Sequence, residues 1–79
     1  MKKDETDLPK LEKGTYLHRK SGKLYEVLGV ALHTETGEAL VMYKPLYSHP
    51  KYEIFARPYG MFVEKVEISG KLVPRFEKV

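Results

Sequence analysis

Apolar and polar positions along the chain occur in short runs that are separated by turn residues. From Gly14 onward these runs are rich in β-branched and aromatic residues, which favour strands. The dipeptides Ser21-Gly22 and Ser69-Gly70 and the segment 36–38 are turn signals between the runs. No apolar stripe of helical period extends over any length. The pattern predicts strands at 15–19, 23–33, 39–47 and 54–58, a tight turn at 59–62, and a last hairpin formed by 63–69 and 71–76.

The run 23–33 has apolar side chains on both faces of the predicted strand. Gly29 lies near its middle, and a glycine inside a strand often marks a bulge or a sharp bend. A bent strand turns different faces toward the core in its two halves, which allows a small sheet to close. We therefore predict an all-β fold, a small antiparallel SH3-like or OB-like barrel of five to six short strands. The predicted core consists of Leu24, Val27, Leu28, Val30, Val41, Tyr43, Ile54, Phe62, Val66, Ile68 and Phe76.

Residues 1–13 differ in composition from the rest of the chain, because four lysines there are cancelled by four acidic residues. We predict a leader over 1–13 that is mobile or forms one short helix, followed by a single β-barrel domain over 14–79. The N-terminus lacks the apolar segment of a signal peptide, and no run approaches the ~18 apolar residues of a membrane span. The chain also has no cysteine. These features predict a cytoplasmic protein without a membrane partner.

Seven short stretches of the chain form a recognisable pattern: Gly14-x-Tyr16-x-His18-x-Lys20-x-Gly22, Tyr25-x-Val27, Ala31-x-His33-x-Glu35-Thr36, Val41-x-Tyr43, Leu46-Tyr47, Arg57-Pro58-x-x-Met61-Phe62 and Pro74-Arg75-Phe76. Together these stretches resemble one known family, the bacterial domain of unknown function numbered sixteen fifty-three. The resemblance covers residues 14–77, and it implies a small β-barrel without implying an activity. One departure is the pair Phe55-Ala56, where the family usually has Trp-Val before the Arg-Pro pair; a phenylalanine keeps the aromatic face but lacks the indole donor.

His33 and Glu35 are the first candidate site, at the mouth of a predicted hairpin. Alternate residues of a strand share a face, so an imidazole and a carboxylate two positions apart lie roughly 6–7 Å apart at their Cα atoms. A carboxylate beside an imidazole fixes its tautomer and raises its pKa, which suits a binding donor or an acid-base pair. The alternative is structural, with Glu35 capping the turn while His33 packs at its edge.

Arg57 is the second candidate, because its guanidinium can bind a carboxylate or a phosphate through two hydrogen bonds. The alternative is an internal ion pair with Glu35 or Glu53. With Tyr43 as a flat apolar wall, the sequence predicts a binding module whose ligand is a small polar or anionic molecule or a segment of a partner protein. The predicted ligand-binding residues are His18, His33, Glu35, Tyr43 and Arg57.

Weak binding of single-stranded nucleic acid is an alternative function. The formal charge of +3 comes entirely from the part of the chain after residue 13, and the segment 13–25 has four basic residues and no acidic one. Tyrosines beside a basic segment can stack on bases, although a barrel without tryptophan also needs tyrosines in its core. Glutamates spread through the other strands limit the expected affinity to roughly micromolar or weaker. The residues of this alternative are Tyr16, Arg19, Lys20, Lys23 and Tyr25.

An enzyme is less favoured than a binding module. The chain has no phosphate-binding loop, no nucleophile elbow and no zinc-protease motif, and its serines and threonines have no fixed relation to a base. A small hydrolase or isomerase that uses His33 and Glu35 as base and orienting group is the one catalytic alternative. His18, His33 and His49 lie on different segments without a short ligand spacing, so neither a metal nor another cofactor is predicted.

Overall fold

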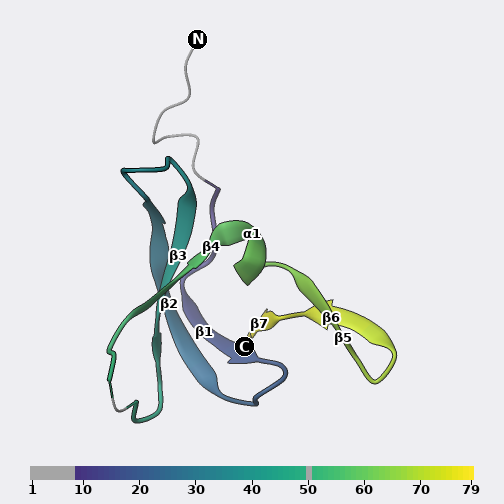
Figure 1. Cartoon of the computed structure of the whole chain (residues 1–79). Helices are drawn as coiled ribbons and strands as arrows, with labels where there is room; N and C mark the ends of the chain where they lie inside the picture. Colours follow the sequence, from purple (N-terminus) through teal and green to yellow (C-terminus); the bar gives the residue numbers. More distant parts are fainter. Residues whose placement is uncertain (1–8, 50) are drawn as a thin grey trace.

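The computed structural model describes residues 9–49 and 51–79, and these residues form seven strands and one short helix (Figure 1). In chain order the elements are β1 (Gly14–His18), β2 (Leu24–Leu32), β3 (Ala39–Pro45), β4 (Phe55–Pro58), α1 (Tyr59–Phe62), β5 (Lys65–Ile68), β6 (Lys71–Pro74) and β7 (Phe76–Lys78).

Five strands form one antiparallel sheet in the order β4-β3-β2-β1-β7, and β5 pairs with β6 in a separate hairpin. The predicted all-β, antiparallel fold is confirmed. Among the residues that the structure describes, no pairing joins β4 to β7, so these two strands are the edges of the sheet. In Figure 1 the β5–β6 hairpin projects to one side of this sheet.

The C-terminal segment contains one strand more than the sequence predicts. The hairpin around Ser69-Gly70 forms as expected, but the run 71–76 is divided at Arg75. The Arg75 amide donates to the carbonyl of Glu64 at 2.9 Å, and the Arg75 carbonyl accepts from the amide of Arg19 at 3.0 Å. These bonds turn the chain away from the hairpin, so that Phe76 lies opposite His18 as part of β7.

Gly29 is the site of a bulge in β2, as its position in the sequence predicts. The pairing of β2 with β3 shifts between Val27 and Gly29. Gly29 has φ +153°, a backbone angle that residues other than glycine rarely adopt. Val27 pairs with Tyr43 and Val30 pairs with Val41. Because residues directly opposite one another share a face, the bulge keeps Val27 and Val30 on the inner face although they are three positions apart. This explains the two-sided apolar pattern of the run.

The core is mainly aromatic, which the sequence predicts only in part. Leu24, Leu28 and Ile54 are exposed, so their assignment to the core is wrong, and Val30, Val66 and Ile68 are only half-buried. Tyr16 and Tyr25 fill the space instead. The buried residues are Tyr16, Tyr25, Val27, Val41, Tyr43, Phe62 and Phe76.

The N-terminal leader is described only from Pro9, where residues 9–13 have no regular secondary structure. Leu11 packs against the core, and the carbonyl of Glu12 accepts a hydrogen bond from the hydroxyl of Tyr16 at 2.7 Å. The rest of the leader prediction, over 1–8, lies outside the described residues. Within 9–49 and 51–79 no helix is long and apolar enough to cross a membrane.

Phe62 is the first test of this core, because its side chain is only 1% exposed and stacks on Phe76. We expect Phe62→Ala to lower the free energy of unfolding by about 3–5 kcal/mol, through lost transfer energy and the cavity left behind. Leu72→Ala, at a position that is 72% exposed, should change it by less than about 0.5 kcal/mol. Urea unfolding followed by circular dichroism measures both, with Phe62→Leu as a milder variant. Equal midpoints for all variants would contradict this core.

Candidate functional site

The structure divides the five predicted ligand-binding residues into two groups. His33 and Glu35 belong to the turn after β2, whereas His18 ends β1 beside the beginning of β2. Nine residues of strand correspond to about 30 Å, so His18 and His33 lie near opposite ends of β2. Tyr43 and Arg57 lie between these ends, and the Arg57 side chain extends toward Tyr43, away from the His33 turn. The five residues therefore do not form one surface.

His33 closes its turn through hydrogen bonds to the backbone. Its amide donates to the carbonyl of Glu38 at 2.8 Å, and its carbonyl accepts from the amide of Gly37 at 2.7 Å. The Nδ1 atom of its ring accepts from the amide of Glu35 at 3.2 Å. Within the described residues, the Glu35 carboxylate is exposed and makes no hydrogen bond to this ring. The contacts favour the structural alternative, with His33 rather than Glu35 as the capping side chain.

The second group gathers around the ring of Phe76. This buried ring stacks on Phe62, with centroids 4.1 Å apart and planes 6° from parallel. Tyr25 and Tyr43 approach it with T-shaped geometry, at 5.8 Å and 5.5 Å between centroids. Two polar groups also contact it: the His18 ring at 4.8 Å and the Arg57 Cζ atom at 5.4 Å from the centroid. We call the five residues His18, Tyr25, Tyr43, Arg57 and Phe76 the Phe76 site.

Arg57 reaches the Phe76 site because β4 pairs with β3, with Arg57 opposite the buried Val41. Its Nε atom donates to the Tyr43 hydroxyl at 3.2 Å. The ion pairs found among the described residues do not include Arg57, so pairing with Glu35 or Glu53 is not observed there. Arg57 is half-buried as a residue, its guanidinium is positioned by a hydroxyl and an aromatic ring, and its charge is not neutralised by a described carboxylate.

His18 contributes a hydrogen-bond donor to the site. The amide of Ser21 donates to His18 Nδ1 at 3.2 Å, and the Ser21 hydroxyl lies 2.8 Å from the same atom. Because Nδ1 accepts, the neutral ring has its proton on Nε2. Burial and then the positive charges of Arg57, Arg75 and Lys20 lower the pKa of His18 from its usual 6.5. At neutral pH the group is therefore an uncharged donor beside a cation.

Tyr43 and Tyr25 act in this site mainly through their buried rings. Tyr43 is part of the core, so it is not the surface wall that the sequence predicts; its hydroxyl is the part that contacts Arg57. The Tyr25 hydroxyl lies 2.8 Å from that of Tyr47. Burial, followed by this hydrogen bond, raises the pKa of Tyr25 above its usual value of 10. The Tyr25 phenol is therefore protonated at any physiological pH.

The residues of the nucleic-acid alternative do not form a stacking platform. Tyr16 and Tyr25 are 5% and 9% exposed, so their faces are occupied by the core. Arg19 is paired with Glu77 at 2.7 Å, and the Lys23 ammonium lies 4.5 Å from the centroid of the Tyr47 ring. Lys20 remains as an exposed cation near His18.

Two features, one in the Phe76 site and one outside it, could not be read from local sequence. Phe76 is predicted only as a core residue, because its role depends on the long-range pairing of β7 with β1. A pocket at the end of β3, lined in part by Tyr47 and Tyr52, is also absent from the prediction; adjacent tyrosine, histidine and proline residues in one loop are its only signal.

As for metals, the described residues contain no cluster of three or more His, Asp or Glu that could hold an ion.

The lowered pKa of His18 predicts a pH dependence of stability. Between the folded pKa and the ordinary value of 6.5 the unfolded chain binds more protons, so the free energy of unfolding falls as pH decreases through this window. We expect NMR titration of the His18 ring to give a pKa below 6.5, and Arg57→Gln to raise it. Lys44→Gln, whose charge is not among those acting on His18, should leave it unchanged. A His18 pKa above 6.5 would contradict this arrangement.

Comparison with known proteins agrees with this architecture. The family described as "Protein of unknown function (DUF1653)" matches residues 14–78. The crystal structure of a DUF1653 protein from Bordetella bronchiseptica is similar, with a TM-score of 0.81 and 32% sequence identity over 96% of this chain and 92% of that chain. No curated protein matches the sequence. The match over nearly all of 14–79 and the shared structure confirm the predicted resemblance: the chain belongs to the DUF1653 family.

Proposed function

We propose that this protein is a non-enzymatic binding module that takes an acidic group, a carboxylate or a phosphate, at the Phe76 site. The acidic group belongs to a small polar molecule or to a segment of a partner protein. The single observation behind the proposal is the state of Arg57, a half-buried residue whose guanidinium contacts the Tyr43 hydroxyl and the Phe76 ring and takes part in no described ion pair.

Arg57 suits this role because its position is fixed before a ligand arrives. A guanidinium binds a carboxylate or a phosphate with two parallel hydrogen bonds, and holding it in place reduces the entropy lost on binding. Its Nε atom is used by Tyr43, which leaves the terminal NH₂ groups for an anion. Partial burial also strengthens the attraction, because the effective dielectric constant is lower than in water.

His18 provides a second contact at the same ring. Its Nε2–H can donate to an oxygen of the bound group, while Arg75 and Lys20 add positive potential around it. One or two charge-assisted hydrogen bonds supply about 1.5–3 kcal/mol each. Such a site binds a simple anion with a dissociation constant of about a millimolar, and a larger ligand gains affinity only through further contacts.

The other functions receive less support. The catalytic alternative needs the Glu35 carboxylate to orient His33, but the His33 ring accepts its hydrogen bond from the Glu35 amide instead. The nucleic-acid alternative needs exposed Tyr16 and Tyr25, whose rings are buried in the core. A cytoplasmic location remains part of our proposal, based on sequence composition.

Arg57→Gln tests the proposal directly. We expect titration of ¹⁵N-labelled protein with inorganic phosphate or acetate, at constant ionic strength set with sodium chloride, to shift the signals of the Arg57 Nε–H and the His18 ring. Arg57→Gln should weaken this binding at least tenfold, because the cation is lost while the chain keeps a side chain of similar length. Far-UV circular dichroism checks that the variant is folded.

Arg19→Gln is the matched control, because it removes the same charge from an arginine that is already paired with Glu77. We expect it to keep wild-type affinity within about twofold, because the Arg19 charge is already paired with Glu77 and Arg19 is not among the residues that contact the Phe76 ring. Equal losses for Arg19→Gln and Arg57→Gln would reduce the effect to net charge and refute the proposal. Shifts that are the same with chloride alone would also refute it.

A further inference from the structure

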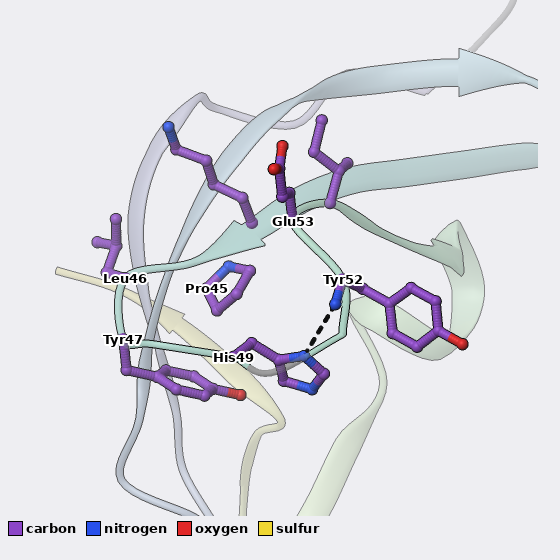
Figure 2. A pocket seen from close by; sticks show the side chains of 8 residues that line it. Pro45, Leu46, Tyr47, His49, Tyr52 and Glu53 are labelled. Atoms are coloured by element: carbon purple, nitrogen blue, oxygen red, sulfur yellow. Dashed lines mark hydrogen bonds between the residues drawn. The ribbon is translucent and has the colours of Figure 1, made fainter.

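A pocket of about 460 Å³ lies where the chain passes from β3 to β4 (Figure 2). Figure 2 shows Pro45 at its centre, with Tyr47 and His49 on one side and Glu53 on the other. The volume is within the usual range for ligand sites, about 300–1,000 Å³. Its lining differs from the Phe76 site. We call it the Tyr47 pocket, and it is lined by Lys44, Pro45, Leu46, Tyr47, His49, Tyr52, Glu53 and Ile54.

Apolar and aromatic surface is concentrated here. Leu46, Tyr52 and Ile54 are 48%, 61% and 50% exposed, and all three lie within one stretch of nine residues. The His49 ring makes an edge contact with Phe55, with centroids 5.1 Å apart, and it lies between Tyr47 and Tyr52 at 6.3 Å and 6.0 Å. A local cluster of exposed apolar side chains is typical of an interaction site.

The polar groups of the pocket are mainly hydrogen-bond donors. His49 Nδ1 accepts from the amides of Lys51 and Tyr52 at 3.3 Å and 3.2 Å, so the neutral ring has its proton on Nε2. The hydroxyls of Tyr47 and Tyr25 share one hydrogen bond, and when Tyr25 donates, the proton of Tyr47 is available for another acceptor. Lys44 and Tyr52 also line the pocket, and their side chains carry further donors.

A proline-rich segment has the complementary chemistry. In the polyproline II conformation its backbone carbonyls form no internal hydrogen bonds, and its prolines have no N–H to leave unsatisfied. Its rings pack on aromatic side chains, and its ordering cost is low because the conformation is already present in the free chain. The donors and aromatic rings of the pocket are therefore matched by the acceptors and the apolar rings of such a segment.

The charge of the rim adds a preference for a basic residue beside the prolines. Glu53 is exposed, and the ion pairs found among the described residues do not include it. Lys44, in contrast, is already within 3.8 Å of Glu26. We propose that the Tyr47 pocket docks a proline-rich segment of a partner protein, with a lysine or an arginine of that segment facing Glu53. The pocket is open to solvent. An open pocket suits an extended peptide that lies across it better than a small molecule, which needs to be enclosed.

The probe for this proposal is a ten-residue polyproline peptide with two arginines at one end. We expect it to shift the backbone signals of residues 44–49 and 51–54 with a dissociation constant below a millimolar, whereas a peptide with alanines in place of the prolines should produce shifts at least tenfold weaker. Tyr52→Ala should reduce the affinity at least fivefold, because it removes an exposed ring whose backbone bond to His49 is retained.

Charge and location are tested by matched variants. Glu53→Gln should weaken the arginine-containing peptide about threefold and leave a polyproline peptide without arginine unchanged. Leu72→Ala, which removes an exposed apolar side chain from β6, should leave both affinities unchanged. Arg57→Gln should also leave them unchanged, so that failure of the Phe76 site and failure of this proposal are distinguishable.

Three results would overturn the proposal. The first is the absence of shifts at millimolar peptide, and the second is equal binding of the proline and alanine peptides. The third is displacement of the shifts to His18 and Arg57, which would place the peptide at the Phe76 site. A single-stranded oligonucleotide that binds residues 44–54 more tightly than the peptide would replace a protein segment with a nucleic acid as the occupant.

Discussion

The stacking of Phe62 on Phe76 is the contact on which most of this domain depends. The two rings come from α1 and β7, which are separated in the chain by the β5–β6 hairpin, and they lie 4.1 Å apart and nearly parallel. A parallel stack occupies one face of each ring. The Arg57 guanidinium and the His18 ring contact Phe76 in addition to this stack. The core thus determines where the polar groups gather. Arg57 and His18 contact the same ring only because β7, which contains Phe76, pairs with β1.

Features with a local cause were predictable from the sequence. The bulge at Gly29 follows from a glycine inside a two-sided apolar run, and the hairpin at Ser69-Gly70 follows from its turn residues. The choice of core residues was less successful. Leu24 and Tyr25 are adjacent and both apolar, so only the register against β1 and β3 decides that Tyr25 faces inward and Leu24 outward. Hydrophobicity alone favours Leu24 as the core residue, whereas the observed core is filled mainly by the aromatic rings of tyrosine and phenylalanine.

In the candidate site, too, contacts that depend on the pairing of distant strands could not be predicted from the sequence. A spacing of two residues places His33 and Glu35 near each other, but the pattern does not reveal that the imidazole bonds to the Glu35 amide rather than to its carboxylate. Arg57 and Tyr43 were selected by residue type alone, and their contact in the structure depends on the pairing of β4 with β3. His18 joins them only because β7 places Phe76 opposite it. The residue types could be selected from the sequence, whereas their grouping depends on the two strand pairings of β4 with β3 and of β7 with β1.

The β5–β6 hairpin has a consequence for the architecture of the chain. It is closed at its base by the hydrogen bond between the Arg75 amide and the Glu64 carbonyl, and by the ion pair of the same two residues at 3.3 Å. Its tip, at Ser69-Gly70, lies in a turn with positive φ at both residues. Because doubling a loop's length costs only about 0.6 kcal/mol of closure free energy, added residues at this tip would barely affect the ring stack. The hairpin is thus a natural insertion point for a tag, a label or a second domain.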